Sequence, residues 1–124
     1  MGAEPGAVRL EIPVDTRYVR IVRLVARGVG STAGFDIEAV DDLRISVEEL
    51  CAAMFEVSDG HPVELAFRLS DGGVEVEGRT HSAPAARVDA ERFALSEQIL
   101  KVACDGFSLD VDDGIAHFTL HKLG

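Results

Sequence analysis

The sequence predicts an α+β two-layer sandwich in which helices cover one face of a mixed, mostly antiparallel sheet. Two kinds of hydrophobic periodicity support this prediction. Five segments alternate apolar and polar residues, as half-buried strands do, and three segments repeat apolar residues every three or four positions, as amphipathic helices do. Their order is strand, helix, helix, strand, strand, helix, strand, strand (βααββαββ). Consecutive strands without an intervening helix pair antiparallel, which gathers the helices on one face.

The first strand is expected at residues 8–12, where Val8, Leu10 and Ile12 alternate with charged residues until Pro13. Residues 1–7 are small and polar, and we expect a flexible N-terminus there. Residues 8–124 are then one domain, because a domain contains roughly 100–150 residues.

A first helix is expected after Asp15 or Thr16, since either side chain can cap a helix N-terminus. Gly28, Gly30 and Gly34 close this segment. Its predicted buried stripe has apolar residues spaced by 4, 3 and 4 positions, namely Tyr18, Val22, Val25 and Val29.

The second helix has the strongest periodic signal of the chain. Asp36 is its expected N-cap, and residues 58–60 (Ser-Asp-Gly) end it. The predicted buried face consists of Val40, Leu43, Val47, Leu50, Met54 and Val57. Beside this face runs a second stripe formed by Asp42, Ser46, Glu49, Ala53 and Glu56.

The second half of the chain predicts two hairpins separated by a third helix. The first hairpin joins strands at residues 63–69 and 74–78, and residues 79–89, which have no period and contain a proline, are expected to form a loop. The third helix is expected at residues 90–103, with its apolar side formed by Phe93, Leu95, Ile99, Leu100 and Val102. Two final strands meet at the turn of residues 112–114.

Composition excludes several classes of function. The chain has 12 Lys and Arg against 22 Asp and Glu, a net charge of −10, which argues against direct nucleic-acid binding. No apolar run approaches the roughly 18 residues of a membrane span, and no secretory leader precedes the first strand. Cys51 and Cys104 lack the spacing of a zinc site, so we expect two reduced, buried thiols in a cytoplasmic protein without a bound metal.

Three segments resemble one known family. The family's first strand and helix are similar to EIPVDTRYVRIVRLVARGVGSTAGF, including Arg23 and Gly34. The family's second helix, EDxxxAVxEAxxNxxxH, resembles DDLRISVEELCAAMFE. Its closing helix and strand resemble ILKVACDGFSLDV, with Asp105 at the acidic position. The family is the GHKL, or histidine-kinase-like, group of ATPases and kinases, and within it the RsbW/SpoIIAB type of anti-sigma-factor serine kinase. The resemblance extends over about residues 8–122 and implies the same fold.

The resemblance also implies a nucleotide site, and the sequence departs from the family there. Active members carry a glutamate that acts as general base or positions water, and four residues later an asparagine that holds Mg²⁺. Glu49 takes the first position, but Ala53 takes the second and has no oxygen for a hard cation. The DxGxG box that ends the family's third strand, and the glycine-rich lid after it, are missing from VEVEGRTHSAP. These departures predict a degenerate site that binds neither ATP nor Mg²⁺, with Glu49 inactive.

Two functions follow from this comparison. The favoured one is non-enzymatic: an anti-sigma-factor-like regulatory protein that binds a sigma factor or an anti-sigma antagonist in a partner-switching circuit. The alternative is an active kinase that uses Mg-ATP to phosphorylate a serine or threonine of such an antagonist. Binding of Mg-ATP distinguishes the two.

A candidate surface for protein partners lies on the first helix. Four arginines follow one another there without an acidic residue between them, although the chain as a whole is acidic: Arg17, Arg20, Arg23 and Arg27. Arginine is enriched in protein interfaces. We expect these side chains to bind an acidic surface, which belongs either to a partner protein or to a second copy of the chain in a homodimer, whose Glu38, Asp41 and Asp42 carry the opposite charge.

Overall fold

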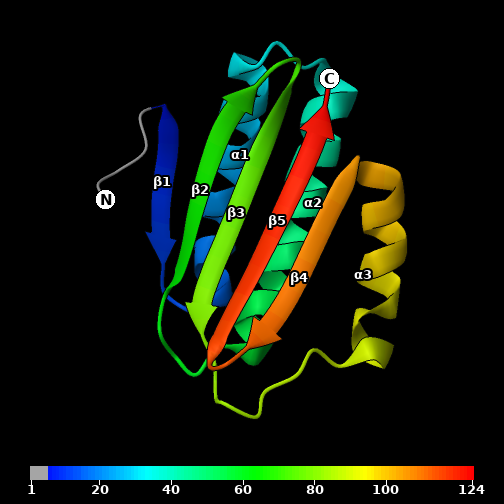
Figure 1. Cartoon of the computed structure of the whole chain (residues 1–124). Helices are drawn as coiled ribbons and strands as arrows, with labels where there is room; N and C mark the ends of the chain where they lie inside the picture. Colours follow the sequence, from blue (N-terminus) through cyan, green and yellow to red (C-terminus); the bar gives the residue numbers. More distant parts are fainter. Residues whose placement is uncertain (1–5) are drawn as a thin grey trace.

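The computed structural model describes residues 6–124 and confirms the predicted order of elements (Figure 1). In this part of the chain, five strands form a single sheet in the order β1-β2-β3-β5-β4, and every neighbouring pair is antiparallel. The elements are β1 (Ala7–Ile12), a 3₁₀ turn η1 (Thr16–Tyr18), α1 (Val19–Thr32), α2 (Ile37–Val57), β2 (Val63–Ser70), β3 (Gly73–His81), α3 (Ala90–Ala103), β4 (Gly106–Asp112) and β5 (Ile115–Leu123).

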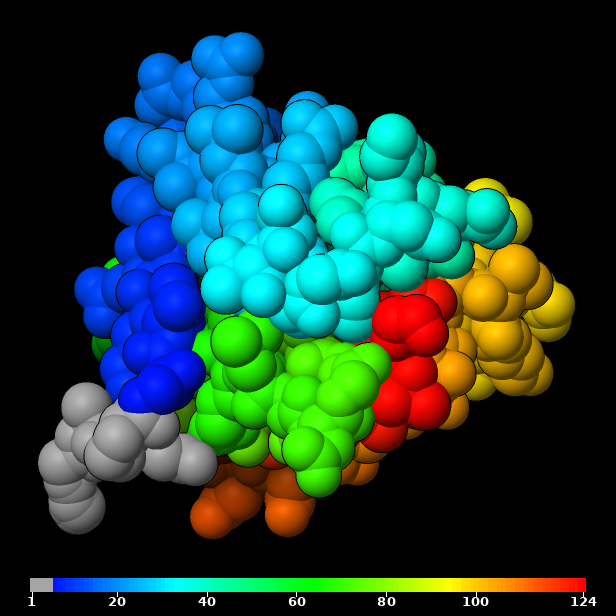
Figure 2. Space-filling model, turned by 90° about the horizontal axis from the view of Figure 1, so that it is seen from above, coloured from blue at the N-terminus to red at the C-terminus, as the bar shows by residue number. Residues whose placement is uncertain are grey.

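The three helices lie on one face of the sheet, as predicted. Helices α1 and α2 pack side by side against it, and α3 lies along the outer side of α2, next to β4 (Figure 1). Seen from above, α1 and the start of α2 form a layer over the strand ends, and β1 and α3 lie on opposite sides of the molecule (Figure 2). Strand β1 is therefore one edge of the sheet, and α3 flanks the other.

The expected flexible N-terminus falls mostly on residues 1–5, which lie outside the described residues. Ala7 departs from that expectation because it is the first residue of β1, paired opposite Arg68 of β2. The pairing continues to Ile12 opposite Val63, so six residues of β1 are held by β2.

The core forms between α2 and the sheet and confirms the predicted register of that helix. Leu43, Val47, Leu50 and Met54 are fully buried. From the sheet, Phe67 and Phe118 supply the two largest buried side chains. The ring of Phe118 lies so close to Gly78 that a Cβ atom there would overlap it, so the absence of a side chain at Gly78 gives the ring its place.

The predicted loop at residues 79–89 begins too early. Strand β3 continues to His81, with Arg79 opposite His117 and Thr80 opposite Ala116 of β5. The side chains continue the alternation as well, because Arg79 is exposed and Thr80 is buried. Hydrogen-bonded pairing with the long strand β5 extends β3 beyond the apolar residues from which its end was predicted.

Two predicted helix faces also need correction. Tyr18 is exposed because it lies in η1, whose tighter turn removes it from the face that α1 buries; the buried residues of α1 are Val22, Ala26, Val29 and Gly30. In α3, Leu95 is 72% exposed and Val102 is 86% exposed. Only Leu100 and Ala103 of α3 are buried, because this helix packs along one narrow side.

Removal of the Leu50 side chain beyond Cβ should destabilise the fold strongly. Leu50 is fully buried between α2 and the sheet, so Leu50→Ala should lower the free energy of unfolding by roughly 2–5 kcal/mol. Denaturant titration followed by circular dichroism measures this change. The matched control is Leu95→Ala, the same substitution at an exposed site, which should stay within about 0.5 kcal/mol of the parent. Equal stabilities of the two variants would contradict the assigned core.

Candidate functional site

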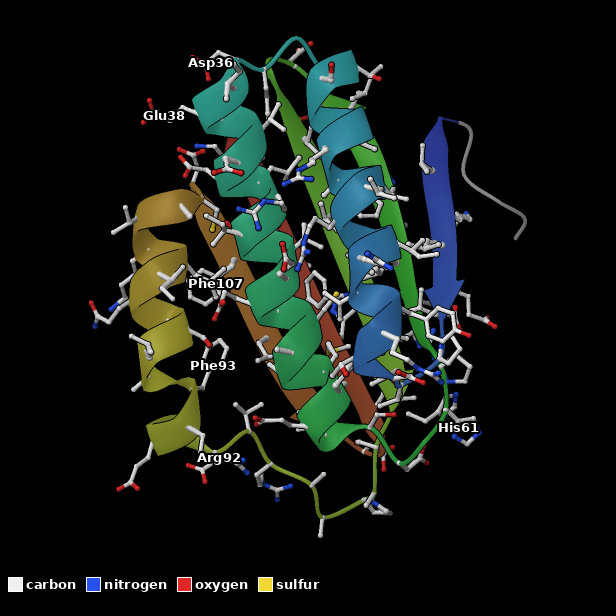
Figure 3. All side chains as sticks on the ribbon, turned by 180° about the vertical axis from the view of Figure 1, so that it is seen from behind. Asp36, Glu38, His61, Arg92, Phe93 and Phe107 are labelled. Atoms are coloured by element: carbon white, nitrogen blue, oxygen red, sulfur yellow. The ribbon has the colours of Figure 1, made fainter. Side chains whose placement is uncertain are left out.

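The candidate site is the side of α2 that carries Glu49 and Ala53. One helical turn separates these two residues, so they lie on the same face. This face is turned toward α3, which packs along it. In Figure 3, Phe93 of α3 and Phe107 of β4 lie beside α2, and both rings are partly buried and packed against the core. The predicted second stripe of α2 therefore meets α3 at Glu49 and Glu56, whereas Asp42 pairs with Lys122 of β5.

Glu49 is joined directly to α3. The hydroxyl of Ser96 donates a hydrogen bond of 2.6 Å to Oε1 of Glu49. A hydrogen bond from a hydroxyl to a carboxylate is shorter and stronger than one between neutral groups. Two turns further along α2, Glu56 lies 4.0 Å from the guanidinium of Arg92 at the start of α3. The acidic side chains on this face thus hold α3 in place.

Ala53 is only 7% exposed and presents a methyl group on this face. A methyl group offers no lone pair to a cation, whereas Mg²⁺ is bound through oxygen ligands. Ser46, also on this face, is fully buried, and its hydroxyl donates to the backbone carbonyl of Asp42. Neither side chain provides an oxygen that is free to bind a metal ion.

The end of β3, where the family's DxGxG box would lie, contains a small cluster of hydroxyl groups. Thr80 is buried on the helix-facing side of β3, and its Oγ1 lies 3.1 Å from the carbonyl oxygens of His61 and Pro62. The same atom lies 3.1 Å from the Oγ of Ser58, the residue that follows α2. Thr80 therefore ties β3 to the loop between α2 and β2. Residues 82–89 then lead directly into α3.

A network of charged side chains joins α1 to α2. Arg23 donates two hydrogen bonds to Glu48, of 2.8 and 3.2 Å, and Arg44 donates to the same carboxylate at 2.7 Å. Arg44 also pairs with Asp41 at 3.0 Å. Partial burial by itself would raise the pKa of Glu48, but the hydrogen bonds from Arg23 and Arg44 outweigh it, so the pKa of Glu48 is lowered from its ordinary value.

The structure separates the four arginines of the predicted partner surface. Arg23 reaches toward α2 and is paired with Glu48, and Arg17 is paired with Asp15, which caps η1. Arg20 and Arg27 are exposed and make no ion pair within residues 6–124. Leu24 lies between them in the sequence and is 64% exposed. The arginine surface is thus formed by Arg17, Arg20, Leu24 and Arg27.

The remaining chemical groups of the described chain offer no reactive or metal-binding arrangement. Cys51 and Cys104 are free thiols, and both are buried. Burial raises the pKa of Cys51 to about 12 and also raises that of Cys104, which leaves both thiols protonated and poorly nucleophilic. Among residues 6–124, no group of three His, Cys, Asp or Glu side chains is placed to hold a metal ion. None of the helices there is long and apolar enough to cross a membrane.

Comparison with known proteins extends this picture. The family model of the histidine kinase-like ATPase domain matches residues 12–100, which is well over half of the chain. The match begins at the end of β1 and reaches the buried Leu100 of α3, so it includes Glu49, Ala53 and Ser96.

Curated relatives match a shorter segment. A serine-protein kinase RsbW from Bacillus pumilus is 35% identical over 66 residues, which cover 50% of this chain and 41% of that protein. The RsbW of Halalkalibacterium halodurans is 24% identical over 75 residues, which cover 59% of this chain and 46% of that protein. The matched segment thus spans less than half the length of these relatives.

One solved structure shares the fold over nearly the whole chain. The crystal structure of the SiaB-SiaC complex from Pseudomonas aeruginosa contains a chain that superposes with a TM-score of 0.60 at 14% sequence identity. The superposition covers 94% of this chain and 89% of that one. It supports the same arrangement of helices and sheet.

The ion pairs of Glu48 with Arg23 and Arg44 predict that part of the free energy of unfolding is lost at acidic pH. Glu48→Gln should lower the free energy of unfolding by about 1–2 kcal/mol at neutral pH, because it removes a charge that accepts from two arginines. The folded pKa of Glu48 lies below 4.5, its ordinary value. Its stabilising contribution is therefore complete above pH 4.5 and is lost as the pH falls through the folded pKa.

Unfolding titrations of parent and variant at several pH values measure this difference. The gap between them should close below pH 4.5, and Glu64→Gln, at an exposed glutamate without an ion pair in the described chain, is the control. A gap that persists unchanged into acid would contradict the assignment to Glu48.

Proposed function

The chain belongs to the histidine kinase-like ATPase domain family, and from this premise we propose that it is an anti-sigma-factor-like regulator that acts by binding a protein partner. In this proposal the chain works in the cytoplasm, within a partner-switching circuit, and it needs no nucleotide. The partner is a sigma factor or an anti-sigma antagonist protein. The observation that carries the non-enzymatic part is the contact between Glu49 and Ser96.

This contact bears on catalysis because Glu49 stands at the family's catalytic position. A general base must reach the proton it removes within hydrogen-bond distance. The carboxylate of Glu49 instead accepts a hydrogen bond from Ser96 of the same chain, with α3 packed along the helix face. Glu49 then has a structural role, joining α2 to α3.

The residues that would hold Mg-ATP do not fit it. Ala53 replaces the metal-binding amide with a methyl group, and this residue is buried. At the end of β3, the hydroxyl of Thr80 is already in contact with Ser58 and two carbonyl groups. No glycine follows Gly78 until Gly106, so the segment before α3 lacks the glycines with which a lid would wrap phosphates.

The alternative function is that of an active serine/threonine kinase, and the names of the curated relatives favour it. Both RsbW proteins compared above are called serine-protein kinases, and the family model that matches this chain is that of an ATPase domain. Under this alternative α3 moves away from α2 when nucleotide binds, and residues other than Ala53 hold the metal. Nucleotide binding separates the two functions.

Partner binding is assigned to the arginine surface. Its two unpaired guanidinium groups, Arg20 and Arg27, flank the exposed Leu24. A cationic rim around an apolar side chain suits a partner surface that is acidic around an apolar pocket. Arg23 is left out of this surface because its guanidinium is committed to Glu48.

Mg-ATP should leave the thermal stability of the protein unchanged. A ligand present at about 100 times its dissociation constant stabilises the folded state by roughly 2.7 kcal/mol, which a thermal-shift assay detects. We expect no shift with Mg-ATP or Mg-ADP beyond the effect of Mg²⁺ alone. An RsbW protein assayed in parallel is the positive control, and a reproducible upward shift specific to Mg-ATP would favour the kinase.

Charge reversal of the arginine surface should reduce partner capture without unfolding the protein. Arg20→Glu combined with Arg27→Glu reverses two exposed charges that have no partner in the described chain. A pull-down from the native host measures capture, and the matched control is Arg87→Glu combined with Lys101→Glu, two exposed positions outside this surface. Replacement of an arginine that is desolvated at the centre of an interface can weaken the free energy of binding by more than about 2 kcal/mol. Equal capture by both double variants would refute the assignment of this surface.

A further inference from the structure

Strand β4 ends the sheet on the side opposite β1 and has a free edge. It pairs only with β5, from Gly106 opposite His121 to Asp112 opposite Ile115. In such a strand, every second residue directs its N–H and C=O groups away from the neighbouring strand. No backbone group elsewhere in residues 6–124 forms a hydrogen bond with the outward groups of β4. They are therefore a template for one more strand.

The neighbouring elements leave β4 accessible. Helix α3 lies beside this strand but packs along α2 (Figure 1). None of the seven residues of β4 is fully buried, whereas each of the other strands in the described sheet contains at least one buried residue. On the helix side of β4, Phe107, Leu109 and Val111 are only partly buried. An added strand would cover this remaining apolar surface.

The charges of β4 all have one sign. Leu109 lies opposite the buried Phe118 and so faces the helices, which turns Asp110 and Asp112 to the other face, where both are exposed. Asp113, in the turn that follows, is exposed as well. None of the three aspartates forms an ion pair within residues 6–124, and β4 contains no lysine or arginine.

These aspartates select against a second copy of the same strand. Edge strands are commonly protected from self-pairing by a proline, a bulge or a charge. Strand β4 has no proline, and its pairing with β5 is regular, so charge is the protection that remains. Two β4 strands side by side would gather the aspartates of both copies without a cation, and like charges across strands are destabilising. The edge is therefore suited to a strand of positive charge.

We propose that the outer edge of β4 binds an extended, basic segment of a protein partner, which adds a strand to the sheet. In this mode of recognition, main-chain hydrogen bonds supply the pairing and the side chains at alternate positions supply the specificity. Lysine or arginine at every second position of the segment lies beside Asp110 and Asp112. The apolar residues between them lie beside Phe107, Leu109 and Val111.

This edge differs from the arginine surface in place and in charge. The arginine surface belongs to η1 and α1 and suits an acidic partner, whereas the edge of β4 suits a basic one. The inference therefore goes beyond the proposed function and does not depend on it.

Fluorescence anisotropy with a synthetic peptide tests the proposal. The probe is a short, labelled and end-capped peptide in which lysine and valine alternate, so that its lysines share one face of a strand. The protein should bind this peptide, with an affinity that falls as the salt concentration rises. A peptide with the same residues grouped into a lysine block and a valine block should bind about tenfold more weakly or less, as should one with glutamate in place of lysine.

Charge reversal on β4 should exchange the preferred peptide. Asp110→Lys with Asp112→Lys should weaken binding of the lysine–valine peptide by about tenfold or more and create binding of the glutamate–valine peptide. The gained binding shows that the variant is folded. The matched control is Asp71→Lys with Glu75→Lys, two exposed acidic residues of the β2–β3 hairpin, which should bind as the parent does. Equal affinity of the two double variants for the lysine–valine peptide would overturn the proposal.

Backbone methylation of the peptide separates strand pairing from simple charge attraction. Alternate residues of a strand direct their N–H groups to the same edge. Methylation of the backbone nitrogens of either the lysines or the valines therefore removes the donors from one edge only. One methylated form should bind like the unmodified peptide, and the other should not bind. Equal binding of the two forms, or no binding of the unmodified peptide, would contradict an added strand.

The arginine surface serves as an independent check. Arg20→Glu with Arg27→Glu should leave the affinity for the lysine–valine peptide unchanged, because both residues belong to α1 and β4 lies at the opposite edge of the sheet from β1. A lost affinity in this variant would place the peptide away from β4 and overturn the proposal. The pull-down and the Mg-ATP assay measure the proposed function separately, so either can fail while peptide binding is observed.

Discussion

The packing of α2 against the sheet is the interaction on which the rest of the structure depends. One seam of this helix, with Val47, Leu50 and Met54 at its centre, is buried against the strands, and the ring of Phe118 fills the space that Gly78 leaves open. Because α2 is fixed in this way, the directions of its other side chains are fixed too. Helices α1 and α3 then pack on its two flanks.

The neighbouring residues Glu48 and Glu49 show how the fixed position of α2 directs adjacent side chains to different helices. Consecutive residues of a helix point about 100° apart. Glu48 therefore reaches Arg23 of α1, whereas Glu49 reaches Ser96 of α3. Each carboxylate joins α2 to a different helix. In a family whose active members use a glutamate of this helix for catalysis, both acidic groups of this chain take part in contacts that stabilise the fold.

The fold of this chain is shared with proteins of very different sequence. The chain matches the family model over residues 12–100 and shares its architecture with a solved structure at 14% identity. Packing of helices on a sheet tolerates such divergence because it requires only apolar residues of suitable size at buried positions. Binding of a metal ion requires particular oxygen atoms, so the loss of nucleotide binding that we propose would need few replacements, such as an alanine at position 53. Members of one family can therefore keep the same fold and differ in catalytic activity.

Periodicity in the sequence determined the class of fold, the order of the elements and the buried face of α2, because these depend on local spacing of apolar residues. Capping by Asp36 was predictable for the same reason. The sequence also directed attention to Glu49 and Ala53, through the resemblance of this helix to the corresponding helix of the histidine-kinase-like family. The partners of Glu49 and of its neighbour Glu48 could not be predicted. Ser96 is 47 residues away from Glu49 along the chain, and Arg23 is 25 residues away from Glu48. Only the tertiary structure decided these pairs, the extension of β3 by β5 and the position of β1 at the end of the sheet, since each depends on which elements become neighbours when the sheet assembles.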